Sequence, residues 1–543
     1  MTPRAPAGFA ALVLAVSGCA GGARSVPAAH RAPAAARVSV GFTMHWPART
    51  TRSHRHAAFV SPSTASVVVE VNPDAATPGP VTFANAPAGG GTSSIAIDAP
   101  PGDDVFLIAL YDAPQTAGET TAAGNELGRV RVAQTIVPNA TNTLSATVIG
   151  TVASVRIGPL PNQPNVIAQP ASGPAGWELV GRAPATFAVA PLDAGGNAIV
   201  QPDAPVTISL APNVRATGIL SVTPVAGTTD QFTVQAVAPN GTTYPTSLAA
   251  TARDANGNLA SSSAVVDATS AVYVAYANGG APAVARFDAH GNGVPLPAGA
   301  FAGLGNPVAM AYDPDDREIL VADAALGKVL AFDENGAPLA AFTAPAIAGV
   351  NALAYDPHNA NVYAAGSGGV TVFAPNGGPP NNGAPATFAA ASATGIAFVA
   401  AAPFGPLNRI AVGNAAASKV AFFNENGNAA GSFSVSAAPA AIAYAPPVGP
   451  NASPQTTAQV YVVSASGIAA FGPFGTRVSA AADGGGPFGI VVDPNSGTPQ
   501  IAERSGNAIA AYLDDLSATD ATRSFATPGA LGFTQPQGVC DVF

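Results

Sequence analysis

Residues 307–332 read PVAMAYDPDDREILVADAALGKVLAF, and this stretch decides the fold of the C-terminal half of the chain. It contains three short apolar runs, at 308–312, 319–322 and 329–332, with Asp, Pro and Gly between them. Short apolar runs between turn residues indicate β-strands, because a helix would need a longer apolar pattern with a period of about 3.6 residues. The stretch therefore predicts a meander of short strands.

The same pattern recurs throughout residues 269–543. Each repeat has one apolar anchor in its first strand, and successive anchors are separated by 43, 43, 46, 48 and 49 residues: Met310, Leu353, Ile396, Ile442, Ile490 and Val539. Four short strands at this period are typical of a β-propeller blade. The last repeat is split, because residues 538–543 supply only its first strand and residues 271–287 supply others. We therefore expect a six-bladed propeller closed by the N- and C-terminal strands of the repeat region, with no exposed sheet edge.

Together these motifs resemble the NHL-type propeller family. In that family Pro, an apolar residue and Asp precede a strand that ends near Ala-Asp, and a cation and an aromatic residue follow. The resemblance implies that a ligand binds where the loops between strands 2 and 3, and between strand 4 and the next strand 1, meet the central channel. The charged and amide side chains of these loops are the candidate ligand-binding residues: Asp323, Asn414, Glu503 and Arg504.

The sequence indicates no enzyme active site, metal site or cofactor. Calcium-dependent lactonase propellers need several oxygen ligands that converge on one ion, and streptogramin-lyase propellers use a His base. His290 and His358 instead fall in turns on the opposite face, where we expect them to be exposed. Three Asp residues that precede Pro are expected to close turns by accepting backbone hydrogen bonds, rather than to form an acidic ring: Asp313, Asp356 and Asp493.

Two further units are expected before the propeller. Residues 38–149 predict a β-sandwich, with strands at 67–71, 94–97, 105–111, 127–136 and 143–149. Residues 150–268 predict a second sandwich, in which Asp-Ala-Gly-Gly-Asn at 193–197 and Asp-Ala-Asn-Gly-Asn at 254–258 form tight turns. This pattern resembles the bacterial immunoglobulin-like modules of surface proteins. The whole chain is thus expected to be all-β.

The N-terminus predicts export. Residues 1–18 contain Arg4 and then a short apolar run, which is typical of a signal peptide and too short to span a bilayer. Val16-Ser17-Gly18-Cys19 resembles the bacterial lipobox, which implies that Cys19 is lipidated; an ordinary secretory signal is the alternative. Residues 19–37, rich in Ala, Pro and Arg, predict a disordered tether. The resulting location is the cell envelope, at the outer membrane or cell surface.

Composition limits the classes of partner. The chain has a formal net charge of −10, and only 10% of its residues are charged. Nucleic-acid binding, which needs clustered Lys and Arg, is therefore not expected. The only cysteines are Cys19 and Cys540, so lipidation of the first leaves the second without an intramolecular partner. By the repeat register Cys540 takes a small, buried position.

Three functions remain open from the sequence. The first is a non-catalytic lipoprotein, held to the membrane by its lipid anchor, whose propeller binds a protein or glycan ligand or acts as a scaffold. The second is a propeller enzyme of the lyase or lactonase type. The third is a structural spacer without a ligand. A fold alone does not choose among them.

Overall fold

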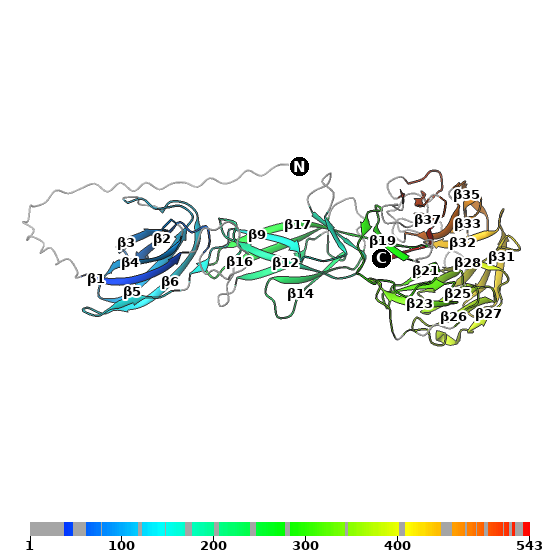
Figure 1. Cartoon of the computed structure of the whole chain (residues 1–543), viewed down its shortest axis with the longest axis horizontal. Coiled ribbons are helices and arrows are strands. Elements are labelled where there is room, and N and C mark those ends of the chain that lie inside the picture. Colours follow the sequence, from blue (N-terminus) through cyan, green and yellow to red (C-terminus); the bar gives the residue numbers. More distant parts are fainter. Residues whose placement is uncertain are drawn as a thin grey trace, which may run out of the picture.

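The computed structural model describes most of the chain between residues 37 and 542 (Figure 1). Outside the described residues lie 1–36, 47–60, 78, 89, 118–121, 147, 169–175, 200–205, 215, 239–245, 277–282, 341, 343–345, 401–407, 447–458, 473–474, 485, 494–497, 506, 514, 521–523, 527–535 and 543. The predicted signal peptide, Cys19 and all of the predicted tether except Arg37 fall in this set.

The described part of the chain is all-β, as predicted. It contains many short strands, one 3-10 helix at Asn381–Gly383 and no α-helix. Among the described residues, no helix has the length and apolar character needed to cross a bilayer.

The first region, β1 to β8, consists of two sheets that enclose one apolar core. Along β1 (Val38–Trp46), buried and exposed residues alternate, because successive side chains of a strand point to opposite faces. One sheet has the order β4-β1-β7, with β4 at Gly91–Ala99 and β7 at Asn142–Leu144. The other has the order β3-β2-β5-β6-β8: Val81–Asn85, Ser66–Val71, Gly102–Tyr111, Glu126–Ile136 and Ile149–Gly150.

The single strand predicted at residues 143–149 is wrong. β7 pairs in parallel with β1, whereas β8 pairs with β6 in the opposite sheet. The chain crosses between the two sheets here, and Val148 is buried in the core. A short apolar run that crosses a core has the same composition as a strand, so the sequence pattern did not separate the two.

The second region, β9 to β17, also has two sheets around one core. The first sheet has the order β10-β11-β17-β16-β13: Val166–Ala168, Gly176–Val180, Leu259–Thr269, Ser247–Arg253 and Thr207–Pro212. The second has the order β14-β15-β12-β9: Leu220–Pro224, Gln231–Ala236, Ala185–Leu192 and Ser154–Pro159. The two predicted Asp turns close as expected, because Asp193 accepts a hydrogen bond from the backbone of Asn197, and Asp254 from that of Asn258.

Six sheets give residues 271–542 a β-propeller-like fold. The first sheet is made of β18 (Ala271–Tyr276), β19 (Ala283–Asp288), β20 (Gly293–Val294) and β40 (Pro536–Val542). The second is made of β21 (Pro307–Asp313), β22 (Glu318–Asp323) and β23 (Lys328–Asp333). The third is made of β24 (Ala352–Asp356), β25 (Asn361–Gly366), β26 (Gly369–Phe373) and β27 (Thr387–Phe388). The β21–β23 sheet has only three named strands among its described residues, with isolated bridges from Lys328 to Ala346 and from Phe332 to Pro338.

The other three sheets each have four strands in chain order. They are made of β28 (Ala393–Val399), β29 (Arg409–Asn414), β30 (Lys419–Asn424) and β31 (Ala429–Ser434); of β32 (Pro439–Ala445), β33 (Gln459–Ser464), β34 (Gly467–Phe471) and β35 (Arg477–Ala481); and of β36 (Pro487–Val492), β37 (Pro499–Glu503), β38 (Ala508–Ala511) and β39 (Phe525–Ala526). Apolar clusters fill the spaces between neighbouring sheets: Ala311 and Leu320 of one sheet, for example, share a cluster with Leu353 and Val362 of the next.

Strand β40 belongs to the sheet that begins this region. It pairs antiparallel with β18, so that Tyr273 lies opposite Cys540 and Ala271 opposite Val542. This sheet therefore contains strands from both ends of residues 271–542.

The second region is attached to the propeller-like region without a linker. β17 ends at Thr269 and β18 begins at Ala271. Val180 of the second region joins the apolar cluster of β18 and β21. Figure 1 shows the three regions in a row along the long axis, with the second region beside β19.

Charged side chains strengthen this junction: Glu334 and Arg286 are buried, and Arg317 is about one third exposed. Arg317, in the turn after β21, makes a two-pronged ion pair with Glu334, through Nε–Oε1 at 3.1 Å and Nη2–Oε2 at 2.5 Å. The same guanidinium donates to the backbone carbonyl of Arg182 in the second region, at 2.7 Å. Arg286, which is fully buried, donates to the carbonyl of Pro164 at 3.1 Å. These contacts fix one face of the propeller-like region against its neighbour.

Candidate functional site at the centre of the six sheets

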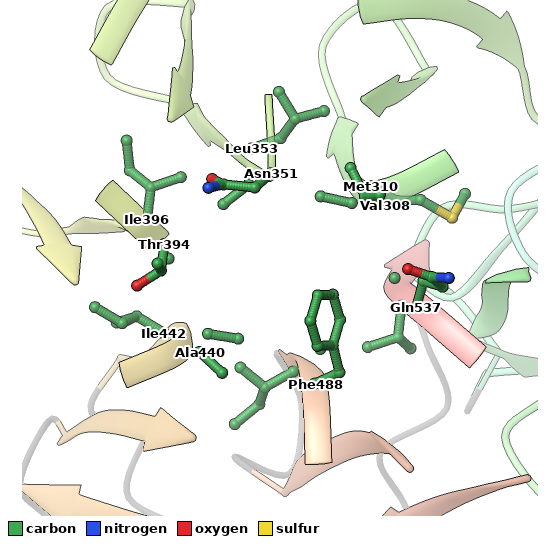
Figure 2. Close-up of a pocket in the computed structure, with 18 residues that line it drawn as sticks. Val308, Met310, Asn351, Leu353, Thr394, Ile396, Ala440, Ile442, Phe488 and Gln537 are labelled. Atoms are coloured by element: carbon green, nitrogen blue, oxygen red, sulfur yellow. The ribbon is translucent and has the colours of Figure 1, made fainter. Parts of the chain in front are cut away.

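A pocket lies where the innermost strands of the six sheets converge, which are β21, β24, β28, β32, β36 and β40. It holds about 390 Å³ of space, part of it open to solvent. The lining repeats in register, and Figure 2 shows the side chains arranged around the opening. One ring is Val308, Asn351, Thr394, Ala440, Phe488 and Gln537; a second ring, two residues further along each strand, is Met310, Leu353, Ile396, Ile442, Ile490 and Val539. The second ring is the set of anchors predicted from the repeat.

Small residues lie between the two rings and allow the strands to approach closely. A Cβ atom added to Gly395 would come within 2.9 Å of the backbone of Ala441. One added to Gly538 would lie 2.9 Å from the backbone of Ala309. Side chains at these positions would push the strands apart, so the narrow pocket depends on Gly and Ala in the first strands.

The pocket has few polar groups, and most of them are already engaged. Thr394 Oγ1 donates to the carbonyl of Pro439 at 2.6 Å. Asn351 Nδ2 donates to the carbonyl of Ala393 at 2.8 Å, while Asn351 Oδ1 is buried and has no hydrogen-bond partner among the described residues. A ligand that donates a hydrogen bond would satisfy this oxygen, because a buried acceptor without a partner is costly.

Arg504 is the predicted candidate that lies against the pocket lining. Its guanidinium carbon is 3.3 Å from the ring centroid of Phe488, a cation–π arrangement, and its Nη2 donates to Gln537 Oε1 at 2.6 Å. Burial lowers the pKa of Arg504. Arg504 therefore positions two lining side chains and contributes positive charge beside the pocket.

Glu503, the residue before Arg504, has an acidic neighbour. Burial and the nearby carboxylate of Asp483 raise the pKa of Glu503 to about 7. Tyr512 donates a hydrogen bond to Asp483 Oδ2 at 3.1 Å. Neither acid belongs to the lining of the pocket. The sequence did not indicate Asp483, which lies in a Gly-rich loop.

Asp323 has a structural environment. It is fully buried, and its carboxylate accepts hydrogen bonds from the backbone N–H groups of Gly305, Asn306, Ala325 and Leu326 at 2.5–3.0 Å. Both oxygens are used to join the loop before β21 to the turn after β22. Asn414 similarly accepts from the backbone of Ala417 at 2.9 Å in the turn after β29. The four candidates therefore do not converge on one point.

The lining of the pocket contains only apolar and neutral side chains. None of the 18 residues that line the pocket is Asp, Glu, His, Lys, Arg, Cys or Tyr. The pocket instead offers aliphatic side chains, one phenyl ring and neutral hydrogen-bonding groups.

The turn residues considered in the sequence lie on the opposite face. Asp313 accepts from the backbone of Asp315, and Asp356 from that of His358, so both close their turns as predicted. Part of the turn after Asp493 lies outside the described residues. Cys540 is buried, and burial raises the pKa of its thiol. The thiol is therefore in a structural rather than a reactive environment.

His290 and His358 are exposed, as predicted, with side chains 62% and 64% accessible. Each nevertheless lies beside carboxylates in an arrangement compatible with a metal ion. The first group is Glu178, Asp288 and His290, and the second is Asp356, His358 and Glu425; in each, one ligand atom per residue lies within 4.8 Å of the others. The sequence did not indicate Glu178 or Glu425, because each is distant along the chain from its His.

No protein-family model matches the sequence, and no curated protein is significantly similar to it. Weak structural similarity extends over half of the chain. A nidogen/laminin complex aligns over 50% of this chain and 98% of its own, with 13% identity and a TM-score of 0.37. A Bacteroides caccae protein of unknown function aligns over 50% and 99%, with 14% identity and a TM-score of 0.33. The WD40 β-propeller domain of Doa1 aligns over 48% and 80%, with 12% identity and a TM-score of 0.34. These low scores carry no conclusion about activity or partner.

Proposed function

We propose that this chain is an exported, lipid-anchored envelope protein whose central pocket binds a ligand without catalysis. The two rings of the pocket lining carry the proposal, because they place aliphatic side chains, Phe488, neutral amides and the Thr394 hydroxyl at one opening, with no acidic or basic side chain among them. In this proposal two β-sandwich domains, the second immunoglobulin-like, form a stalk over residues 38–268. Residues 269–543 form an NHL-like propeller of six blades, closed by the pairing of β18 with β40.

The lining favours a protein ligand over a glycan. Sugar binding relies on many hydrogen-bonding groups, whereas most of the lining side chains here are aliphatic. An apolar side chain of a partner would fill the pocket, and a neighbouring N–H or hydroxyl would reach Asn351 Oδ1. Arg504, beside Phe488, would add an attraction for an acidic group at the rim.

The pocket is tested by capture from an envelope extract with the full-length chain and two variants. Ala440→Arg introduces a charged side chain into the lining, whereas Val478→Arg places the same side chain on β35, at a position already 51% exposed. We expect wild type and Val478→Arg to retain a partner that Ala440→Arg loses, with equal melting temperatures for all three. If Ala440→Arg captures the same partners as wild type, the proposal that a ligand binds in the pocket is contradicted. If the chain still captures its partner after the extract has been treated with a protease, the ligand is a glycan instead.

The lipid anchor is tested separately, through the two cysteines. Cys19→Ser is expected to move the protein from the detergent phase to the aqueous phase on detergent partitioning, because the acyl chains supply the membrane affinity. Cys540→Ser is the matched control and should leave partitioning unchanged. Equal partitioning of wild type and Cys19→Ser would contradict lipidation at this position.

A further inference from the structure

The second histidine–carboxylate group connects two neighbouring sheets on the face opposite the pocket. Asp356 ends β24, and His358 lies in the turn before β25. Glu425 lies in the turn between β30 and β31 of the next sheet. His358 Nδ1 and Glu425 Oε1 are hydrogen-bonded to each other at 3.0 Å, and one oxygen of Asp356 completes a set of three ligand atoms within 4.8 Å of one another.

The backbone and a neighbouring amide hold these side chains in place. Asp356 Oδ1 accepts from the backbone N–H of His358 at 2.9 Å, so the two ligands belong to one closed turn. Asn408 Nδ2 donates to Glu425 Oε1 at 2.9 Å and orients that carboxylate. Such supporting hydrogen bonds are typical of the residues that surround a metal site.

One oxygen of this group lacks a partner. Asp356 is fully buried, yet its Oδ2 has no hydrogen-bond partner among the described residues. A buried carboxylate oxygen without a partner is costly, and a bound cation would remove that cost.

We propose that Asp356, His358 and Glu425 bind one divalent transition-metal ion that joins the β24–β27 sheet to the β28–β31 sheet. One imidazole nitrogen and two carboxylate oxygens form a mixed donor set that suits Zn²⁺, and also Co²⁺ and Mn²⁺. The exposed side of the group, where His358 is 64% accessible, leaves room for water to complete the coordination.

The other histidine group provides an internal contrast. In Glu178, Asp288 and His290, both Asp288 oxygens are already used: Oδ1 accepts from the backbone of His290 and of Asn292, and Oδ2 accepts from Asn292 Nδ2 at 2.6 Å. His290 Nδ1 is 3.9 Å from Glu178 Oε1, which accepts from Thr269 Oγ1 at 2.6 Å. A metal ion at either group would replace existing hydrogen bonds, but only in the second group does the Asp keep an oxygen without a partner among the described residues.

The turn after β21 is a useful comparison, because an Asp closes it in the same way but no histidine follows. Asp313 closes it as Asp356 closes its own, and Asp313 Oδ2 is likewise buried without a partner among the described residues. Asp315 takes the place of His358 there, and it accepts from Tyr355 OH at 2.8 Å. The free oxygen thus belongs to both turns, and only the second also has an imidazole and a carboxylate from the next sheet.

The experiment measures Zn²⁺ binding by the untagged full-length chain, using isothermal titration calorimetry and thermal unfolding with and without the metal. Wild type is expected to bind one Zn²⁺ at this site and to melt at a higher temperature with it. His358→Gln and Glu425→Gln should weaken binding by more than about tenfold, because even the loss of a supporting residue commonly has an effect of that size. His290→Gln and Asp315→Asn should bind like wild type.

Because His358 is exposed, its replacement is not expected to unfold the protein, so a loss of binding would not result from misfolding. The variants should melt with wild type when the metal is absent, and His54 and His56 are common to all the proteins compared. Co²⁺ should give a visible d–d spectrum in wild type that His358→Gln loses. Unaltered Zn²⁺ affinity in both His358→Gln and Glu425→Gln, or no Zn²⁺ binding by wild type, would overturn the proposal.

Discussion

The two ends of strand β21 have very different surroundings. Beyond its C-terminal end, the buried Glu334 pairs with Arg317, which is about one third exposed and also donates to the carbonyl of Arg182 in the second region. Near its N-terminal end, Val308 faces a pocket whose lining contains no charged side chain. Buried charges are tolerated only when they are paired and hydrogen-bonded. One face of the propeller-like region is therefore committed to attachment, and the other is left accessible at its centre.

The contrast also shows how one repeat serves two purposes. The first strands of the six sheets are nearly interchangeable at the pocket, because each contributes an apolar residue to the same ring. The opposite face differs from sheet to sheet. Near the second region, Arg317 in the turn after β21 pairs with Glu334 after β23, and Arg286 of β19 is buried. Sequence variation in the turns thus adds attachment without altering the centre.

The largest expected effect comes from deleting most of strand β40, which extends from the pocket toward the opposite face. Deleting residues 538–543 removes most of β40, which pairs with β18 and contributes Val539 to the pocket. The edge of β18 that β40 covered is then open to association with other chains. We expect aggregation and loss of the cooperative unfolding transition, measured by calorimetry and light scattering. Removing residue 543 alone is the control; a deletion variant that melts like wild type would refute the expected closure.

The next effect concerns the attached face. Glu334→Ala leaves Arg317 without its ion-pair partner and removes the acceptor for Tyr312 OH. Because Arg317 stays about one third exposed, the loss of its partner costs less than in a fully buried pair, about 2 kcal/mol. We expect a loss of that order in urea unfolding. Asp74→Ala, which breaks the exposed pair with Arg131, should have no measurable effect. Equal stability of Glu334→Ala and wild type would show that the junction contributes little.

On the pocket face, Asp323→Ala tests whether this residue supports loops or binds a ligand. The change leaves backbone N–H groups of four residues without their acceptor, at a cost of about 2 kcal/mol. Asn414→Ala, at a half-buried residue, should cost less than about 1 kcal/mol. Loss of the captured partner without any loss of stability in Asp323→Ala would instead assign it to ligand binding.

The smallest effect is a pH dependence at Glu503. Its pKa is about 7 in the folded chain, against an ordinary value of 4.5, because of burial and Asp483. The native state thus holds a proton that the unfolded state releases, so this residue's contribution is full below pH 4.5 and falls as the pH rises to about 7. After allowance for solvent screening of this half-exposed group, we expect about 1 kcal/mol. Glu503→Gln should flatten this part of the stability–pH curve; an unchanged slope would contradict the shift.

The repeat and its anchors could be predicted from the sequence, because a repeat is a local property. The sequence analysis placed the ligand site on the loops, however, and did not predict that Met310 and its counterparts line the pocket. What the sequence did not give are contacts between side chains from separate segments. Arg504 and Gln537 are 33 residues apart, and His358 and Glu425 are 67 apart. Such pairs depend on how neighbouring sheets meet, and no local pattern encodes that.

The candidates chosen by residue type were the least informative. Asp323 is a charged residue in a loop of the expected ligand face, yet its oxygens are used by backbone N–H groups. The residue type alone does not distinguish an Asp that closes a turn from an Asp that binds a ligand. The number of hydrogen bonds that reach each oxygen separates them, and this requires coordinates.

The pairing of β18 with β40 also has a consequence for the order of events during synthesis. Tyr273 and Cys540 lie opposite each other, although 267 residues separate them in the chain. Such long-range contacts form slowly, because a long loop must close before they can add any stability. The first sheet of this region therefore stays incomplete until β40 has been synthesised. Until then β18 has an open edge, so the completion of this sheet is tied to a segment made long after its first strand.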